Sequence, residues 1–245
     1  MIRQARRGLV RVHRKVNSLG NRRSCSLCGW KGFAFETLGS IKATRRRGRC
    51  PTCRAKERDR AFPFLARDLR TEGKDVLHVA PEPNIVELLR RDSRSYLSID
   101  LNSPLAMQHM DLTELDIPDA AYDLIMCSHV LEHIPDDRRA MSEMFRVLRP
   151  GGELWVSVPV VGESTYEDWS KQTPQERIEA FLQYDHVRIY GLDIADRLAS
   201  VGFSVEVLST EQLPPEDVTR EGLATRRPTR IFLCRKREAG DRSAQ

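Results

Sequence analysis

The chain has 245 residues, of which 40% are hydrophobic and 31% are charged. This composition excludes a wholly disordered protein, and the length allows one sizeable core with a small appendage but not two large domains. The longest apolar runs are of strand length, well short of the roughly 18 residues that a transmembrane helix needs. The N-terminal stretch also lacks the apolar core of a secretory signal peptide, so we expect a cytoplasmic protein.

Charge is unevenly distributed along the chain. Residues 1–70 carry 20 Lys and Arg against 4 Asp and Glu, whereas the rest of the chain carries 20 against 31. A basic quarter is thus joined to an acidic remainder. The division predicts two physical units that have different partners.

Apolar residues recur at steps of three and four through residues 1–20, which predicts a helix with one apolar face. Basic residues cover much of the rest, and no acidic residue precedes Glu36. Such a basic amphipathic segment can lie on an anionic membrane surface, which would place the protein at the membrane periphery, or contact the phosphates of a nucleic acid. An organelle transit peptide, an unstructured tail and a helix packed on its own protein remain alternatives.

Four of the six cysteines form two pairs with two residues between the partners, Cys25 with Cys28 and Cys50 with Cys53. Two such pairs supply the four thiolates of a closed tetrahedral site, so we expect a structural Zn²⁺ ion. The pattern predicts a zinc-ribbon-like unit with a connecting helix over residues 21–70, whose folding depends on the metal. A disulfide framework is disfavoured because no export signal is present. Cys127 and Cys234 lie in apolar runs and are expected in the core.

Arginine and lysine crowd around the second cysteine pair, in residues 45–49 and 54–60. These charges can balance the thiolates of the metal site, or they can bind nucleic acid. Aromatic residues do not interleave with the basic run, as a base-stacking surface would require. Both interpretations stay open.

From residue 72 onward, strand-like and helix-like patterns alternate. Alternation of this kind predicts an α/β domain with a doubly wound, mostly parallel sheet of seven strands, which we place at residues 71–237 with a disordered tail at 238–245. The expected strands are 76–80, 96–99, 107–110, 122–127, 153–158, 203–208 and 230–234, and the expected helices are 84–91, 136–148 and 189–200.

Polar residues follow three of these strands at their carboxyl ends, where ligands bind in open parallel sheets. Asp100 is placed to accept both hydroxyls of a ribose, and Asp111 to accept a hydrogen bond from an adenine amino group. Ser128 and His129 follow the next strand, where a substrate would meet the cofactor. Each carboxylate alone is as readily explained as a helix cap or turn residue, but the ordered set predicts a nucleoside ligand.

The run YDLIMCSHVLEHIPDDRRAMSEMFRVLRPGGELWVSVP and its surroundings, residues 75–208, resemble the class I S-adenosylmethionine-dependent methyltransferases, in the branch with an LEHI motif after the fourth strand. The resemblance implies a Rossmann-like methyltransferase fold, S-adenosylmethionine as cofactor and methyl transfer as the reaction. The segments CPTCRAKERDR and DHVRIYG are similar to a zinc-bearing subgroup associated with bacterial glycan or cell-surface biosynthesis.

The first loop departs from the family, because the sequence from His78 to Asn84 contains no glycine where the family is glycine-rich. His78 stands where the family often has an acid, and Glu82 offers a carboxylate to the cofactor's ammonium group. We expect Glu82, Asp100 and Asp111 to converge on one nucleoside-shaped crevice. The residues expected to bind the cofactor are His78, Ala80, Pro81, Glu82, Asp100, Leu101, Asp111, Leu112, Ser128, His129 and His133.

For a hydroxyl acceptor, a base with a pKa near neutrality would assist methyl transfer, and His186 or His129 are the candidate catalytic residues. His133 is expected to pack at the cofactor's edge, and Arg188 to pair with an anionic group of the substrate. Residues 160–183, with Tyr166 and Trp169, are long and polar enough to form a lid.

The sequence as a whole predicts a methyltransferase that acts on a hydroxyl or other nucleophile of a small molecule or glycan. An RNA methyltransferase is an alternative within the same enzyme class. A non-catalytic protein that binds nucleic acid or membrane on a degenerate methyltransferase fold is an alternative from another class.

Overall fold

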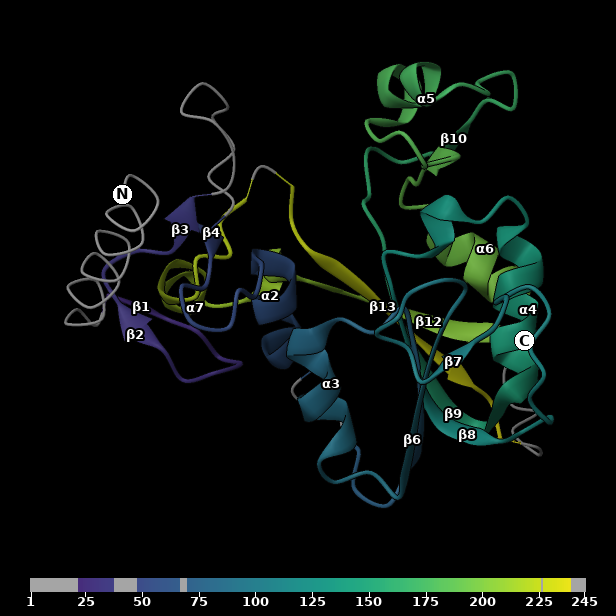
Figure 1. The fold of residues 1–245 in the computed structure, drawn as a ribbon, viewed down its shortest axis with the longest axis horizontal. Helices are drawn as coiled ribbons and strands as arrows, with labels where there is room; N and C mark the ends of the chain where they lie inside the picture. The colour runs from purple at the N-terminus through teal and green to yellow at the C-terminus, as the bar shows by residue number, and fades with distance from the viewer. Residues whose placement is uncertain (1–21, 38–47, 67–69, 226, 239–245) are drawn as a thin grey trace, which may run out of the picture. The chain divides into compact units, whose positions relative to one another are not determined.

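The computed structural model describes residues 22–37, 48–66, 70–225 and 227–238. The predicted helix at 1–20, the arginines at 45–47 and the tail from residue 239 lie outside them. The chain forms two compact units, one of residues 1–68 with 209–229 and one of residues 69–208 with 230–245 (Figure 1).

The described residues of the first unit form short hairpins, two α-helices and one 3₁₀ turn. Strand β1 (Arg23–Ser24) pairs with β2 (Lys31–Gly32), and β3 (Glu36–Thr37) pairs with β4 (Gly48–Arg49), both antiparallel. Helix α2 (Glu57–Leu65) follows, as predicted. Later in the chain come the 3₁₀ turn η2 (Thr210–Gln212) and helix α7 (Pro215–Arg220). One buried cluster of this unit contains Cys25, Trp30, Cys50 and Ala55, and Phe62 of α2 is also buried.

The segment 209–229 corrects the domain boundary drawn from the sequence, which joined it to the second domain. It packs in the first unit, where α7 contacts β1. The Glu221 carboxylate accepts hydrogen bonds from the Ser24 hydroxyl at 2.5 Å and the Ser26 backbone N–H at 2.9 Å. The buried Arg60 donates to the Glu221 carbonyl at 2.8 Å. These long-range polar contacts leave no periodic signal in the sequence.

The second unit contains the predicted seven-stranded sheet, in the order β12-β13-β9-β8-β5-β6-β7. Strands β9, β8, β5, β6 and β7 run parallel, and β13 is antiparallel to β9. The strands are β5 (Asp75–Val79), β6 (Ser95–Asp100), β7 (Gln108–His109), β8 (Tyr122–Ser128), β9 (Leu148–Ser157), β12 (Phe203–Ser209) and β13 (Arg230–Lys236).

Helices cover the sheet on both sides, which completes the doubly wound architecture. Helix α3 (Pro83–Arg90) packs on β5 and β6, and α4 (Asp137–Val147) packs on β9 and against α6 (Ile194–Ser200); Figure 1 shows α3 on one side of the sheet and α4 and α6 on the other. Apolar strand residues such as Leu77 and Ile125 are fully buried between these layers. Every helix among the described residues is too short or too polar to cross a bilayer.

The segment between β9 and α6 differs from the sequence expectation. Helix α5 (Pro174–Phe181) lies inside the stretch predicted as an irregular lid, and a capping box of Thr173 and Glu176 begins it. Strand β10 (Tyr166–Glu167) pairs with β11 (Arg188–Ile189), so the helix predicted to begin at 189 begins at Ile194 instead. The Thr-Pro-x-Glu signal of α5 was readable in the sequence and was missed.

Candidate functional site

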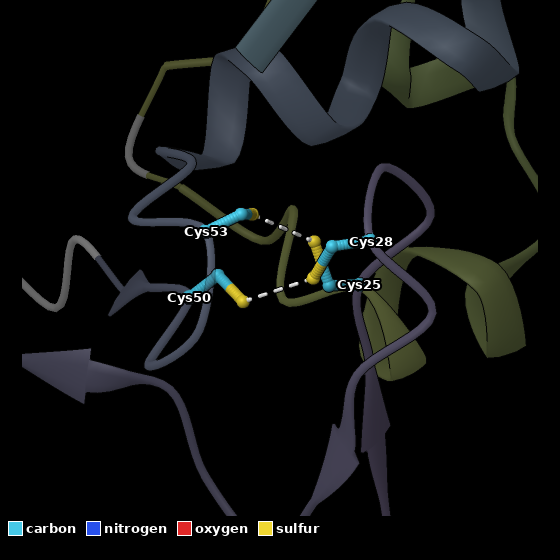
Figure 2. Close-up of side chains that lie close together, drawn as sticks. All are labelled: Cys25, Cys28, Cys50 and Cys53. Carbon is cyan, nitrogen blue, oxygen red and sulfur yellow. Dashed lines mark hydrogen bonds between the residues drawn. The ribbon is translucent and has the colours of Figure 1, made fainter. Parts of the chain in front are cut away.

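Three places in the structure contain candidate functional residues: a cysteine cluster, the carboxyl edge of the central sheet, and a cluster of histidines with one glutamate. The first cluster is formed by the four paired cysteines, whose sulfur atoms lie within 4.8 Å of one another. The Cys25 and Cys53 sulfurs are 3.7 Å apart, as are those of Cys28 and Cys50. Figure 2 shows the four side chains facing one another from two loops. Zinc–sulfur bonds of about 2.3 Å at tetrahedral angles separate the sulfurs by about 3.8 Å, so this donor set fits Zn²⁺.

The two loops that carry these cysteines have the same backbone design. In the first loop, the Gly29 N–H donates to the Cys25 carbonyl at 2.9 Å, and in the second the Arg54 N–H donates to the Cys50 carbonyl at 3.0 Å. Gly29 has φ of 70° and Arg54 has φ of 67°. A non-glycine residue pays a steric cost in this left-handed region. Two turns of one shape thus present two sulfurs each to a shared centre.

The electrostatics of the cysteine cluster favour at least one thiolate. A hydrogen bond from the Cys25 thiol, together with nearby backbone N–H groups, lowers the pKa of Cys50 to about 5 despite its burial. Burial raises the pKa of Cys53 to about 11. A thiolate beside neutral thiols is a ready starting ligand for a metal ion, and binding displaces the remaining protons.

Most of the basic residues described near this cluster are engaged within the first unit. The Arg60 guanidinium is buried, lies 3.7 Å from the centre of the Phe35 ring and donates to the carbonyls of Gly48 and Ala55. Arg54 pairs with Glu36. These arginines therefore serve the fold of the unit.

In the second unit, the polar residues predicted to bind the cofactor follow neighbouring parallel strands. Val79 pairs with Ile99 of β6 and Cys127 of β8, so the next residues, Ala80, Asp100 and Ser128, lie level at the carboxyl edge of the sheet. Asp100 in turn pairs with His109 of β7, and Asp111 comes two residues later. Adjacent strands are about 4.8 Å apart, so the edge forms one row of polar positions.

Asp100 and Asp111 are each held by a local turn. One Asp100 oxygen accepts from the N–H groups of Asn102 at 2.8 Å and Ser103 at 2.7 Å. One Asp111 oxygen accepts from the Thr113 N–H at 2.8 Å and hydroxyl at 2.7 Å, and these bonds lower the pKa of Asp111. The turns fix each carboxylate through one oxygen and leave the other for a ligand.

Glu82 reaches back to the edge from the loop after β5. Its carboxylate is 3.0 Å from His78 Nε2 and also accepts from the Ser128 hydroxyl. Burial opposes its ionisation, but the hydrogen bond and charge of His78 outweigh burial and lower the pKa of Glu82. Its contacts thus tie together the ends of β5 and β8.

His78 was predicted to bind the cofactor, and the structure corrects this. Its side chain is 0% exposed and lies between Glu82 and the Tyr96 hydroxyl, which is 2.9 Å from Nδ1. A fully enclosed ring cannot touch a ligand, so His78 positions Glu82 instead. Leu112 is also buried in the apolar core, so its side chain is directed away from a ligand at the edge, whereas Leu101 is exposed.

Two residues at this edge adopt the backbone conformation that usually requires glycine. Ala80 has φ of 51° and His129 has φ of 56°. The left-handed conformation costs an L-residue roughly 1–2 kcal/mol. Ala80 therefore gives the first loop a left-handed turn without a glycine, and the strained residues lie at the carboxyl edge of the sheet.

The second cluster comprises His129, Glu132, His133 and His186. Glu132 and His133 lie in the 3₁₀ turn η1 (Leu131–His133) after β8. His129 Nδ1 is 3.1 Å from one Glu132 oxygen, and the His133 and His186 rings meet edge to face with centres 4.7 Å apart. The structure thus brings both predicted catalytic histidines to Glu132, and it places His186 against His133, which was expected to pack against the cofactor.

The segment 185–191 clamps η1 and delivers His186 to this cluster. The Val187 N–H donates to the Glu132 carbonyl at 3.0 Å, and the buried Arg188 donates to the carbonyls of Leu131 and Pro135, both at 2.8 Å. Arg188 also pairs with Glu167 at 2.7 Å. The prediction that Arg188 binds an anionic substrate is therefore wrong, because its donors are used inside the protein.

Sequence reasoning missed the acidic partners of this region. Glu132 orients His129, and Asp137 accepts from the Tyr190 hydroxyl at 2.6 Å and from Arg197 at 3.1 Å. Burial lowers the pKa of His186, which favours its neutral form. The run LEHIPDD at residues 131–137 contains these acidic residues and was the sequence signal that could have indicated them.

Comparison with known proteins supports the class of fold and enzyme. Residues 63–156 match the family model described as "Methyltransferase domain". A Mycolicibacterium smegmatis protein described as a probable S-adenosylmethionine-dependent methyltransferase is 36% identical over 150 residues, which are 56% of this chain and 54% of that protein. A phosphatidylethanolamine N-methyltransferase of Cereibacter sphaeroides is 34% identical over 94 residues, 38% of this chain and 42% of the relative. The chain thus spans about half the length of these curated relatives.

Solved structures show the same fold at low identity. The [4+2]-cyclase SpnF aligns with a TM-score of 0.57 at 17% identity, covering 84% of this chain and 88% of its own. A Burkholderia thailandensis 1,6-didemethyltoxoflavin-N1-methyltransferase aligns with a TM-score of 0.52 at 16% identity, covering 74% and 79%. Together, the family match and the named relatives show that residues 63–156 are similar to the methyltransferase domains of S-adenosylmethionine-dependent enzymes.

Proposed function

We propose that the protein transfers a methyl group from S-adenosylmethionine to an oxygen or other nucleophile of a small molecule or glycan. The observation that carries the proposal is the level row of Ala80, Asp100 and Ser128 at the carboxyl edge of the sheet, next to the histidine cluster. The row would hold the cofactor, and the cluster would meet the acceptor. Several relatives are named methyltransferases of small molecules or lipids, which is compatible with this acceptor class.

The cofactor would be held through the free carboxylate oxygens. Asp100 would accept the ribose hydroxyls, and Asp111 would accept from the adenine amino group. Glu82, fixed by His78, would offer negative charge to the ammonium group of the methionine part. The left-handed turn at Ala80 would let the backbone of the first loop approach the cofactor without a glycine.

The bound cofactor supplies a methyl group on an activated sulfonium, so the protein's work is to align the acceptor and exclude water. His129 is held through Nδ1 by Glu132, which leaves Nε2 to take a proton. The cofactor, when bound, would supply the methyl group to the acceptor oxygen, and its sulfur would keep the electron pair of the broken carbon–sulfur bond. His129 would accept the proton that the acceptor oxygen loses.

We further propose a structural Zn²⁺ bound by Cys25, Cys28, Cys50 and Cys53. The sulfur spacing of 3.7 Å supports it. The four thiolates fill a tetrahedral site, so this ion would stabilise the first unit and take no part in methyl transfer.

Calorimetric titration of the zinc-loaded chain with S-adenosylhomocysteine tests the cofactor assignment. We expect saturable binding with about one site per chain and a 10- to 100-fold weaker affinity for Asp100→Asn, since one charged hydrogen bond is worth about 1.5–3 kcal/mol. Asp116→Asn, which removes an exposed carboxylate outside the row, should bind like the wild type. No saturable binding would favour the non-catalytic alternative.

Retention on RNA tests the alternative acceptor. An RNA methyltransferase would bind RNA with an affinity that falls steeply as salt rises. We expect no such binding by the wild-type chain, and methylation of a small-molecule or glycan fraction instead, measured with tritium-labelled cofactor. Salt-sensitive RNA binding together with labelled RNA would overturn the proposed acceptor class.

A further inference from the structure

Three potential metal ligands outside the cysteine cluster lie close together in the second unit. The ligand atoms of Glu132, His133 and His186 are all within 4.8 Å of one another. Two imidazoles and one carboxylate are the protein ligands of many catalytic zinc and non-haem iron sites. Such a set leaves coordination positions for a substrate or water.

Glu132 points to a ligand independently of this proximity. Its side chain is 2% exposed, yet among the described residues no hydrogen-bond partner exists for its buried oxygen Oε2. The other oxygen, Oε1, is held by His129 at 3.1 Å. Burying a carboxylate oxygen without a partner is costly, so buried acids of this kind usually meet a cation or a donor.

One nitrogen of the His133 ring is held by Asp185, as is common for histidines that bind a metal through the other nitrogen. Its Nδ1 is 3.3 Å from the Asp185 carbonyl and 3.4 Å from the Asp185 carboxylate. Metal-binding histidines commonly donate their second ring N–H to a carboxylate or carbonyl, which fixes the ring and the tautomer. In His133, this arrangement leaves Nε2 for the metal.

The clamp described above holds the third ligand in place. Val187 donates to the Glu132 carbonyl, and two nitrogens of Arg188 donate to the carbonyls of Leu131 in η1 and of Pro135 just after it. His186, 53 residues after His133, is thereby fixed against it. A site assembled from two rigidly joined segments is suited to holding a small ion.

We propose that Glu132, His133 and His186 bind a divalent transition-metal ion, with Zn²⁺ as the expected occupant. Zinc bonds to nitrogen and oxygen are about 2.0–2.2 Å long, so small rotations of the three side chains close the site. The ion neutralises the unpartnered oxygen of Glu132. His129 orients the carboxylate and is not itself a ligand.

This inference deepens the proposed function and rests on it for its consequence. The cluster follows β8 next to Ser128, beyond the predicted cofactor row. An ion there with an open position would bind an oxygen of the acceptor and lower the pKa of its hydroxyl. The acceptor would thus be an oxygen nucleophile, and its proton would pass to the nearby His129.

Metal content of the full-length protein tests the site. After zinc loading and dialysis, we expect about two Zn²⁺ per chain in the wild type and about one in Glu132→Gln and in His186→Ala, by plasma mass spectrometry. Glu114→Gln and His109→Ala, which change an exposed acid and an exposed histidine elsewhere in the unit, should retain about two. Circular dichroism and a thermal melt establish that each variant is folded.

Cobalt substitution distinguishes the two sites without cysteine variants, which can unfold the first unit. Co²⁺ bound by thiolates has charge-transfer bands that a histidine and carboxylate site lacks. We expect the first equivalent of Co²⁺ to give these bands and the second to add only visible ligand-field bands, which Glu132→Gln removes. The proposal would be overturned if the folded wild type bound one equivalent of metal in total, both when loaded with Zn²⁺ and, in the separate experiment, when loaded with Co²⁺.

Titration with S-adenosylhomocysteine in parallel separates this inference from the proposed function. Glu132→Gln should bind it like the wild type, because the metal serves the acceptor. One metal equivalent with intact cofactor binding would refute the metal site alone. Two metal equivalents without cofactor binding would refute the proposed function and leave the metal site standing.

Discussion

The two edges of the central sheet carry acidic residues of opposite character. At the amino edge, Asp75 at the start of β5 pairs with Arg94 and with Arg149 at 2.9 Å, and Arg149 also pairs with Asp123 at 2.7 Å. At the carboxyl edge, the Asp100 carboxylate accepts from the N–H groups of Asn102 and Ser103 in its own turn. The acids of the amino edge are thus paired with arginines, whereas no arginine or lysine among the described residues pairs with Asp100.

Left-handed backbone occurs at both edges: Ala80 and His129 lie at the carboxyl edge, and Ala120 lies just before β8 at the amino edge. Near the carboxyl edge, the buried oxygen Oε2 of Glu132 has no hydrogen-bond partner among the described residues. The ion pairs of Asp75 and Asp123 thus stabilise the sheet at its amino edge, and we propose that the carboxyl edge binds the ligand.

Substitution of Arg188 should cause the largest loss of stability, because this buried arginine forms ion pairs and hydrogen bonds near the carboxyl edge as Arg149 does at the amino edge. Arg188→Met removes the hydrogen bonds to the carbonyls of Leu131 and Pro135 and leaves Glu167 paired with Arg197. We expect the free energy of unfolding to fall by about 3–5 kcal/mol, measured with urea. Arg138→Met, which loses an exposed bond to Ser200, should change it by less than about 0.5 kcal/mol. Equal effects would show that the clamp is dispensable.

Asp100 and Asp75 should separate binding from stability. Asp100→Asn should weaken S-adenosylhomocysteine binding 10- to 100-fold and leave the melting temperature within about 2 °C of wild type. Asp75→Asn should leave binding unchanged and reduce the free energy of unfolding by about 1–3 kcal/mol. If Asp75→Asn weakens binding as strongly as Asp100→Asn, the two edges do not have separate roles.

The same Asp75 variant should alter the response to acid. Hydrogen bonds from Arg94 keep the pKa of Asp75 below its ordinary value of about 3.9. A carboxyl with a depressed pKa in the folded state adds stability above its unfolded pKa and loses it as pH falls through the folded value. Urea denaturation below pH 4 should therefore show a shallower loss of stability in Asp75→Asn than in wild type. Parallel curves would contradict the assignment.

The smallest effect is expected at Ala80. Ala80→Gly relieves the left-handed strain but adds freedom to the unfolded chain, so stability should change by less than about 1 kcal/mol. Ala80→Val places a β-branched side chain in that conformation and should cost about 1–2 kcal/mol more. Thermal melts of both variants measure this. An Ala80→Gly variant much less stable than wild type would show that the methyl group, and not the turn, matters.

The sheet and the cysteine cluster were predictable because their signals are local. Alternating apolar runs gave the seven strands, and the spacing of Cys25, Cys28, Cys50 and Cys53 gave the cluster. The level row of Asp100 and Ser128 followed from the rule that ligands bind at the carboxyl ends of parallel strands.

The remaining features depend on contacts between distant residues, which one sequence does not reveal. The Glu221 contacts that place 209–229 in the first unit span more than 190 residues. The burial of His78 depends on Tyr96 in the next strand. His186 meets His133 only because Arg188 joins its segment to η1. In each case, a polar side chain is used for packing where the sequence suggested exposure.

Hydrogen exchange with and without S-adenosylhomocysteine tests the difference between the two edges most directly. The amides of Ala80, Glu82 and Asn84 and those at 100–103 and 111–113 should exchange more slowly in the complex, whereas those at 74–75, 94–95 and 122–123 should not change. Protection at the amino edge alone, or at neither edge under saturating ligand, would contradict the assignment of the carboxyl edge as the binding site.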